Sequence, residues 1–281
     1  MRALWTAASG MKAQQMNMDV VANNISNVST TGFKAQKAEF KDLLYTYSQP
    51  VSNKVEEGQP VNLQVGHGVM PVATSRKFMT GNAENTGNPT DLAISYGMGF
   101  FVIENPNDPG NADKRFYTRD GNFKFSVEDD QLTLVTSQGE RVLTTDDGYI
   151  QMPSNAKDFS VSQSGVVTAK SVEGETLQLG QLQTVTFANP EGLKALGDNF
   201  FVTTENSGAP IMEEDGTRET TILQNYLENS NVQLVDEMVR MIVAQRAYEI
   251  NSKSVQTADD MLNTVNPVSY THLTLPTILL V

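Results

Sequence analysis

The stretch LWTAASGMKAQQMNMDVVANNI, residues 4–25, decides the fold of this chain. Its less polar positions recur at alternating steps of four and three residues, which places them in one narrow stripe along a helix. The stripe comprises Leu4, Ala8, Met11, Gln15, Met18, Ala22 and Ile25. Met, Ala and Gln favour a helix, so we predict one over about 4–28. Because the stripe is too narrow to form a core alone, this helix needs a partner.

A second stripe with the same steps lies near the other end of the chain. It comprises Leu234, Met238, Met241, Gln245, Tyr248, Ser252, Val255, Asp259 and Leu262, and its apolar first half also contains Ile242. Residues 229–231 (NSN) are typical of an N-cap cluster, and Pro267 is expected to end the helix. The two helices can pair with each other, with neighbouring subunits, or with both. This pattern predicts a subunit of an assembly.

Between the two helices the pattern changes to short runs of β-prone residues. The clearest runs are 100–103, 123–127, 132–135, 176–187 and 200–202. Breaks that contain glycine separate them, many about 8–12 residues apart or a small multiple of that, which is typical of an antiparallel sandwich or barrel. No long helical pattern interrupts these runs.

The predicted fold class is therefore α+β. The N- and C-terminal helices pair as a coiled-coil-like inner domain, and the centre is an all-β domain of sandwich-like or barrel-like form. The N-terminal helical part covers 1–45 and includes an amphipathic piece at helical spacing over 35–47; an extended linker covers 46–65. The β domain covers 66–226 and the C-terminal helix 227–266. Residues 267–281 match neither the helical nor the strand pattern, and we expect them to be a non-native tail.

Composition excludes several classes of function. Twenty basic and thirty-three acidic residues give a net charge of −13, which repels phosphate backbones and argues against nucleic-acid binding. The absence of cysteine excludes disulfides, thiolate metal sites and cysteine nucleophiles. We see neither a cleaved secretory signal nor a run long enough to span a membrane.

No constellation of residues points to catalysis. The two histidines are His67, in a glycine-flanked loop, and His272, in the unusual tail. The acidic groups at 129–130, 146–147 and 213–215 fall at predicted turns, where we expect water to solvate them. Gly97 and Gly99 precede a strand rather than a helix, so they are expected to form a bend and not a phosphate loop. We predict no catalytic residue, cofactor, metal or small-molecule substrate.

Several stretches together resemble the flagellar axial proteins, the rod and hook family. They are ANNISNVSTTGFK (22–34), FKDLLY (40–45), GHGV (66–69), PVAT (71–74), YTRDGNF (117–123), NSNV (229–232) and MIVAQRAYEINSK (241–253). The resemblance covers residues 1 to about 265. The long spacer at about 45–65 is similar to that of the members that build the distal part of the rod, because a typical hook protein lacks it.

The resemblance implies a non-enzymatic structural subunit that polymerises helically with itself into a hollow, rigid rod. Such a rod spans the periplasm of the basal body, transmits torque and passes export substrates. Implied partners are proximal rod proteins, the hook protein, the surrounding flagellar rings and the type III export apparatus, with export requiring no cleaved signal peptide. The expected subunit-interface residues are Leu4, Met11, Met18, Asn23, Asn24, Ile25, Asn27, Gly32, Phe33, Leu234, Met238, Met241, Ile242, Tyr248, Val255 and Leu262.

Other functions remain open on sequence alone. Within the family the alternative is a proximal rod or hook subunit. Outside it, the alternatives are a secreted murein hydrolase and a cytosolic coiled-coil adaptor. Trp5, in the first helical turn, is expected either to anchor an interface or to face the core.

Overall fold

The structure is a computed structural model that describes residues 2–47, 64–106, 115–128, 130–154, 156–172, 174–213 and 219–271. The chain forms two compact units. Unit 1 contains Met1–Asn23, Gln36–Ser75 and Val235–Val281, and unit 2 contains Asn24–Ala35 and Arg76–Leu234. In the part of the chain that is described, neither helix is long and apolar enough to cross a membrane.

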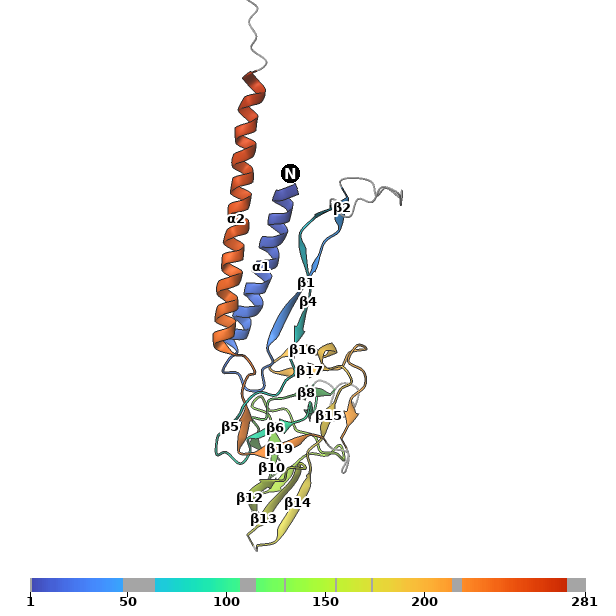
Figure 1. The fold of residues 1–281 in the computed structure, drawn as a ribbon. Coiled ribbons are helices and arrows are strands. Elements are labelled where there is room, and N and C mark those ends of the chain that lie inside the picture. Colours follow the sequence, from blue (N-terminus) through green and yellow to red (C-terminus); the bar gives the residue numbers. More distant parts are fainter. Residues whose placement is uncertain are drawn as a thin grey trace, which may run out of the picture. The chain divides into compact units, whose positions relative to one another are not determined.

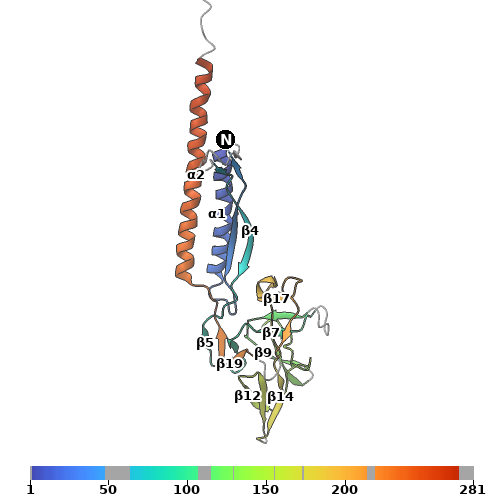
Figure 2. The ribbon, with the colours of Figure 1, turned by 45° about the vertical axis from the view of Figure 1, so that its right-hand side comes forward.

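Unit 1 is built on two long helices and a β ribbon (Figures 1 and 2). The helices are α1 (Arg2–Ser26) and α2 (Leu234–Thr271). The ribbon pairs β1 (Gln36–Asp42) with β4 (Val69–Arg76), and β2 (Tyr45–Tyr47) runs antiparallel to β3 (Gln64–Gly66). In both views α1 lies between α2 and the ribbon. The predicted helices at the two ends are therefore confirmed.

Three local predictions in this part of the chain are wrong. The piece at helical spacing over 35–47 forms β1 and β2, because its residues alternate between charged and less polar types with a period of two and pair with other strands. Pro267 does not end α2, which continues to Thr271; a proline removes only one backbone hydrogen bond, and here it lies near the helix end, where few residues follow. The cluster at 229–231 is not an N-cap, since α2 begins at Leu234.

The predicted linker over 46–65 falls mainly on residues 48–63, and the predicted non-native tail over 267–281 falls mainly on 272–281. Both segments lie outside the described residues, so these expectations stay predictions.

Unit 2 is made of antiparallel strands. Its largest sheet has the order β16-β17-β8-β7-β15-β18. The members are β16 (Lys194–Gly197), β17 (Phe200–Val202), β8 (Phe116–Thr118), β7 (Phe100–Ile103), β15 (Thr184–Thr186) and β18 (Ile211–Met212). A short 3-10 helix, Pro190–Gly192, precedes β16.

Smaller sheets complete unit 2. Two have three strands each, in the orders β11-β10-β9 and β12-β13-β14, and two are pairs, β19 with β6 and β20 with β5. The three-stranded sheets contain β9 (Lys124–Glu128), β10 (Gln131–Val135), β11 (Gln151–Pro153), β12 (Ala156–Val161), β13 (Val166–Ser171) and β14 (Thr176–Gln181). The pairs contain β5 (Ala83–Asn85), β6 (Leu92–Tyr96), β19 (Thr221–Gln224) and β20 (Tyr226–Glu228). The mostly β character of the centre is thus confirmed.

The buried apolar side chains among the described residues of unit 2 form three separate clusters. The largest, the main core, includes Leu92, Phe101, Phe123 and Leu134. The second core, which includes Phe100, Phe187 and Phe201, contains rings packed edge to face with centroids 5.5–6.0 Å apart. The third is small: Phe33, Ala35 and Val232, with Val28 packed against them. This third cluster joins the two segments of unit 2 that lead to the helices.

Candidate functional site

The terminal helices bury small residues against their neighbours. On α1 the buried side chains are Ala7, Ala13, Val20, Val21 and Asn24. The predicted interface residues Leu4, Met11, Met18 and Ile25 are half-buried on the same helix. Ser9 Oγ accepts a hydrogen bond from Val69 N at 3.4 Å, so one side of α1 packs on the β ribbon.

The buried stripe of α2 differs from the predicted stripe, because six of the nine predicted positions are exposed and three are half-buried. Among the described residues, its most buried side chains are Ala244, 1% exposed, and Glu237 and Ala258. Met241 and Val255 are half-buried, and their role in contacts between subunits stays a prediction. The physical reason is the close approach of the helices: a Cβ added at Gly10 would lie 2.8 Å from Asn251 Nδ2. Small residues permit this distance, so the larger residues of the predicted stripe lie at its edges.

Large apolar side chains on the first half of α2 remain in water. Among them Val235 is 72% exposed and Ile242 is 58% exposed. The exposed apolar face of α2 consists of Leu234, Val235, Met238, Val239, Ile242 and Val243. Tyr248 and Leu262 are exposed further along the helix, and Trp5 on α1 is 78% exposed, so it does not face the core. Contiguous apolar surface of this kind marks a site of association.

The remaining predicted interface residues lie at the start of unit 2. Gly32, Phe33 and Asn24 are buried in unit 2, and Asn27 is half-buried there. Asn23 is exposed and is the last α1 residue of unit 1. Gly32 N donates to Glu228 O at 2.7 Å, and Asn231 N donates to Phe33 O at 3.4 Å. We call residues 28–35 and 228–232 the junction, since the two segments of unit 2 that lead to α1 and α2 are bonded to each other there.

A buried ion triad stands at the centre of the junction. Lys34 Nζ lies 2.6 Å from Glu228 Oε1, and Arg119 Nε lies 3.1 Å from Glu228 Oε2. All three side chains are no more than 1% exposed. One carboxylate therefore faces two cations, which leaves a buried net charge of +1.

Backbone groups and the hydroxyl of Thr80 provide further hydrogen bonds to the triad. Lys34 Nζ also donates to Met79 O at 2.9 Å, and Gly81 N donates to Glu228 Oε1 at 2.7 Å. Arg119 Nη1 donates to Gly99 O at 2.6 Å and to Gly97 O at 3.3 Å. The predicted bend at Gly97 and Gly99 is thus confirmed between β6 and β7, and its carbonyl groups hold the guanidinium. Such charge-assisted bonds offset part of the cost of burying the ions.

Asn231 binds the same region through its side chain. Its Oδ1 accepts from Ala35 N at 2.7 Å, and its Nδ2 donates to Lys77 O and to Met79 O. The asparagine therefore ties the two segments of the junction together, which explains why it does not cap α2.

Burial lowers the pKa of Lys34 to about 8 from 10.5. Loss of hydration is the main cause, and the charge of Arg119 adds to it, while Glu228 opposes both. Because the folded state holds this proton less tightly than the unfolded chain, the unfolded state binds more protons between these two values. The stability of the protein therefore rises with pH across that window.

We expect this rise of stability with pH to vanish when Lys34 is replaced. Between pH 8 and pH 10.5 the free energy of unfolding of the wild-type protein should increase by up to about 3 kcal/mol relative to Lys34→Met. Urea unfolding followed by near-UV circular dichroism at several pH values measures the difference. Parallel pH profiles for the two proteins would contradict the expectation.

The other candidate groups are structural. His67 Nε2 lies 2.5 Å from Thr46 Oγ1 beside the β2–β3 pair. The predicted solvation of the acidic turns is wrong for Glu213, which is buried and accepts hydrogen bonds from the hydroxyl groups of Thr184, at 2.7 Å, and Thr220, at 2.8 Å. Hydroxyl donors replace water there. No group of three or more acidic or histidine side chains in the described ranges could hold a metal ion.

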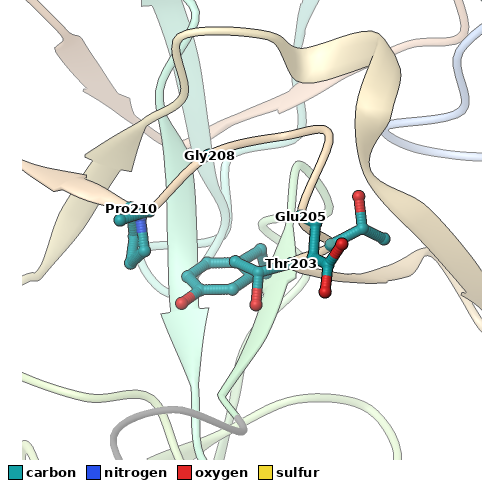
Figure 3. Close-up of a pocket in the computed structure, with 7 residues that line it drawn as sticks. Thr203, Glu205, Gly208 and Pro210 are labelled. Atoms are coloured by element: carbon teal, nitrogen blue, oxygen red, sulfur yellow. The ribbon is translucent and has the colours of Figure 1, made fainter.

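A cavity of 360 Å³ lies beside β8 and the loop that follows β17 (Figure 3). Its lining consists of Tyr117, Thr203, Thr204, Glu205, Gly208, Ala209 and Pro210. The lining offers a single carboxylate and neither a histidine nor a basic side chain. It therefore supplies no pair of groups for acid–base or nucleophilic chemistry.

Sequence reasoning missed the ion triad. Lys34, Arg119 and Glu228 lie in or beside stretches that carried the resemblance to axial proteins, but none was predicted as a functional residue. A lysine between the apolar residues Phe33 and Ala35 was the only local signal. Its partner lies 194 residues away, a pairing that spacing in one sequence does not reveal.

Comparisons with known proteins agree on one family. The profile described as "Flagella basal body rod protein" matches residues 4–34. "Flagellar hook protein FlgE/F/G D1 domain" matches residues 93–169, and "Flagellar basal body rod FlgEFG protein C-terminal" matches residues 223–267.

Individual relatives extend over almost the whole chain. The flagellar basal-body rod protein FlgG of Borreliella burgdorferi is 46% identical over 95% of this chain and 98% of that protein. FlgG of Bacillus subtilis is 38% identical over 93% of this chain and 97% of that protein. A crystal structure of the Helicobacter pylori hook protein FlgE2 aligns with 60% of this chain and 47% of that chain, at 13% identity and a TM-score of 0.25, too low to support an argument. By its relatives and by all three profiles, the chain belongs to the flagellar basal-body rod FlgEFG family.

Proposed function

We propose that this protein is the structural subunit of the distal flagellar rod and that it polymerises helically with itself through α1 and α2. The main support is the exposed apolar face of α2, because a single copy leaves that face in water and contact with another copy would bury it. The names of the FlgG relatives support the assignment to the rod. Rod proteins of this family are structural and not enzymes.

The finer architecture follows from the same argument. α1 and α2 pair as a coiled-coil-like inner domain whose narrow seam leaves the apolar face of α2 for neighbouring copies, and unit 2 forms a sandwich-like or barrel-like β domain. The predicted interface residues Met238 and Ile242 lie on that face, and Met11 and Met18 lie at the edge of the helix pair. Burying such residues between copies stabilises a polymer at about 25 cal/mol per Å² of apolar surface.

The assembled rod has further proposed partners. These are the proximal rod proteins, the hook protein, the surrounding rings and the export apparatus, and the rod spans the periplasm after export without a cleaved signal peptide. A proximal rod or hook subunit is the second candidate, because a Bacillus subtilis protein named FlhP, from the flagellar hook-basal body complex, is 30% identical over 95% of this chain.

Electron microscopy of the concentrated, purified protein tests the proposal. We expect straight, stiff tubes that grow with protein concentration, since helical contacts repeat along one axis. Curved, flexible tubes would favour the hook alternative. A protein that stays monomeric at every concentration, with or without preformed rod fragments as seeds, would reject self-assembly.

A further inference from the structure

The junction of unit 2 is built differently from the two cores beside it. Its apolar cluster contains only Phe33, Ala35 and Val232, with Val28 at its edge, whereas the main core and the second core are larger and form separate clusters. Bonds between polar groups provide most of what joins residues 28–35 to residues 228–232. A region with few apolar contacts opens at lower free energy than a packed core.

We propose that the junction is a latch, which opens as one local unit while both cores stay folded, and that Glu228 holds it shut. The inference concerns unit 2 alone and goes beyond the proposed rod function. An open latch releases both chain segments that lead to α1 and α2, and a closed latch fixes both at once.

The arrangement of charges explains why Glu228 has this role. Among the described residues it is the carboxylate that pairs with both Lys34 and Arg119, and its Oε1 also accepts a hydrogen bond from Gly81 N. Its backbone oxygen accepts a hydrogen bond from Gly32 N. Without its negative charge, two buried cations would face each other, an arrangement far more costly than losing one hydrogen bond.

Other charged groups near the latch have partners of their own. Asp120 Oδ1 accepts from Thr31 Oγ1 at 2.9 Å, and Glu84 Oε2 accepts from Asn229 Nδ2 at 2.8 Å. Both carboxylates bind neutral side chains on the two sides of the junction. The lowered pKa of Lys34 agrees with the excess of positive charge at its centre.

Hydrogen exchange of the full chain tests the latch, with Glu228→Gln as the variant. The amides of Gly32, Ala35 and Gly81 report on the junction, and those of Leu134 and Leu143 report on the cores. We expect the junction amides to lose protection by about a hundredfold or more, which follows from the large cost of an unpaired buried charge. The core amides should keep theirs.

Two further variants separate charge from packing. Glu84→Gln removes an exposed negative charge but keeps an oxygen that can accept from Asn229 Nδ2, so it should leave all amides unchanged. Adding Lys34→Met to Glu228→Gln removes one of the two opposed cations and should restore at least about tenfold of the lost protection. Equal loss at junction and core amides, no loss at all, or no recovery in the double variant would each overturn the proposal.

A measurement on the wild-type protein covers the case in which Glu228→Gln does not fold. In low concentrations of urea, exchange of the junction amides should depend little on urea, because a local opening exposes little surface. Exchange of the core amides should accelerate steeply. The same steep dependence at both sets of amides would mean that the junction opens only by global unfolding, and the latch would be rejected.

Discussion

Gly121→Ala is expected to destabilise unit 2 by more than about 4 kcal/mol. A Cβ atom at Gly121 would lie 1.6 Å from the carbonyl oxygen of Leu92 and 2.7 Å from its carbonyl carbon. Both obstacles are backbone atoms, so no side-chain rotation relieves the clash. Urea unfolding monitored by near-UV circular dichroism measures the loss.

The surroundings leave strand β6 and the segment around Gly121 no room to separate. Leu92 N donates to Gly121 O at 3.0 Å, and Phe123 N donates to the same oxygen at 2.9 Å. Leu92 is 0% exposed and Phe123 is also buried, both in the main core. Moving Leu92 away would break its hydrogen bond to Gly121 O and open that core.

Gly87→Ala is the matched control. Gly87 has a φ of +74°, yet no atom lies within 4 Å of an added Cβ. Alanine there suffers only the strain of the left-handed backbone, about 1 kcal/mol. If Gly121→Ala cost no more than Gly87→Ala, the close approach to Leu92 would not be the reason for glycine at position 121.

Sequence patterns predicted the elements whose signal is local. The runs at 100–103 and 200–202 match β7 and β17 residue for residue, because each is a short apolar run that follows a glycine or an asparagine and ends at a polar residue. The predicted run 176–187 contains two strands, β14 and β15, separated by Leu182 and Gln183. Apolar residues continue through that break, so periodicity alone did not show it.

Patterns failed where packing between distant segments decides the outcome. The ribbon strand β1 carries charged residues at Lys37, Glu39 and Lys41, and its pairing with β4 overrides its helical spacing. On α2 the sequence favoured Met238, whereas the structure buries Glu237 and Ala244. The largest residues define the visible stripe, but the smallest ones permit the closest approach of two helices.

The ion triad shows the same limit at the candidate site. Charged residues are normally exposed, so a single sequence gives no reason to bury Lys34, Arg119 and Glu228 together. Only the fold brings the three segments to one point. The prediction of an assembly came instead from the two narrow stripes, each of which needs a partner helix, and the sequence also showed that the first half of the second helix is broadly apolar.

Ile242→Asp is expected to abolish polymerisation at concentrations where the wild-type protein forms rods. Ile242 is 58% exposed in the single chain, so the substitution should change the stability of the monomer by no more than about 0.5 kcal/mol. In a polymer that buries this face, each copy would carry an unpaired carboxylate into an apolar contact. A penalty of about 3 kcal/mol raises the concentration needed for assembly by about a hundredfold.

Gln256→Asp adds the same charge at an exposed polar position of α2 and is the control. Sedimentation of polymers over a range of protein concentrations gives the threshold for each variant, and hydrogen exchange confirms that the monomers are equally folded. If both variants raised the threshold alike, added negative charge on a chain of net charge −13 would explain the effect through repulsion between copies. A threshold raised by Ile242→Asp alone would place the apolar face of α2 inside the contact between copies, because only a desolvated position distinguishes the two carboxylates.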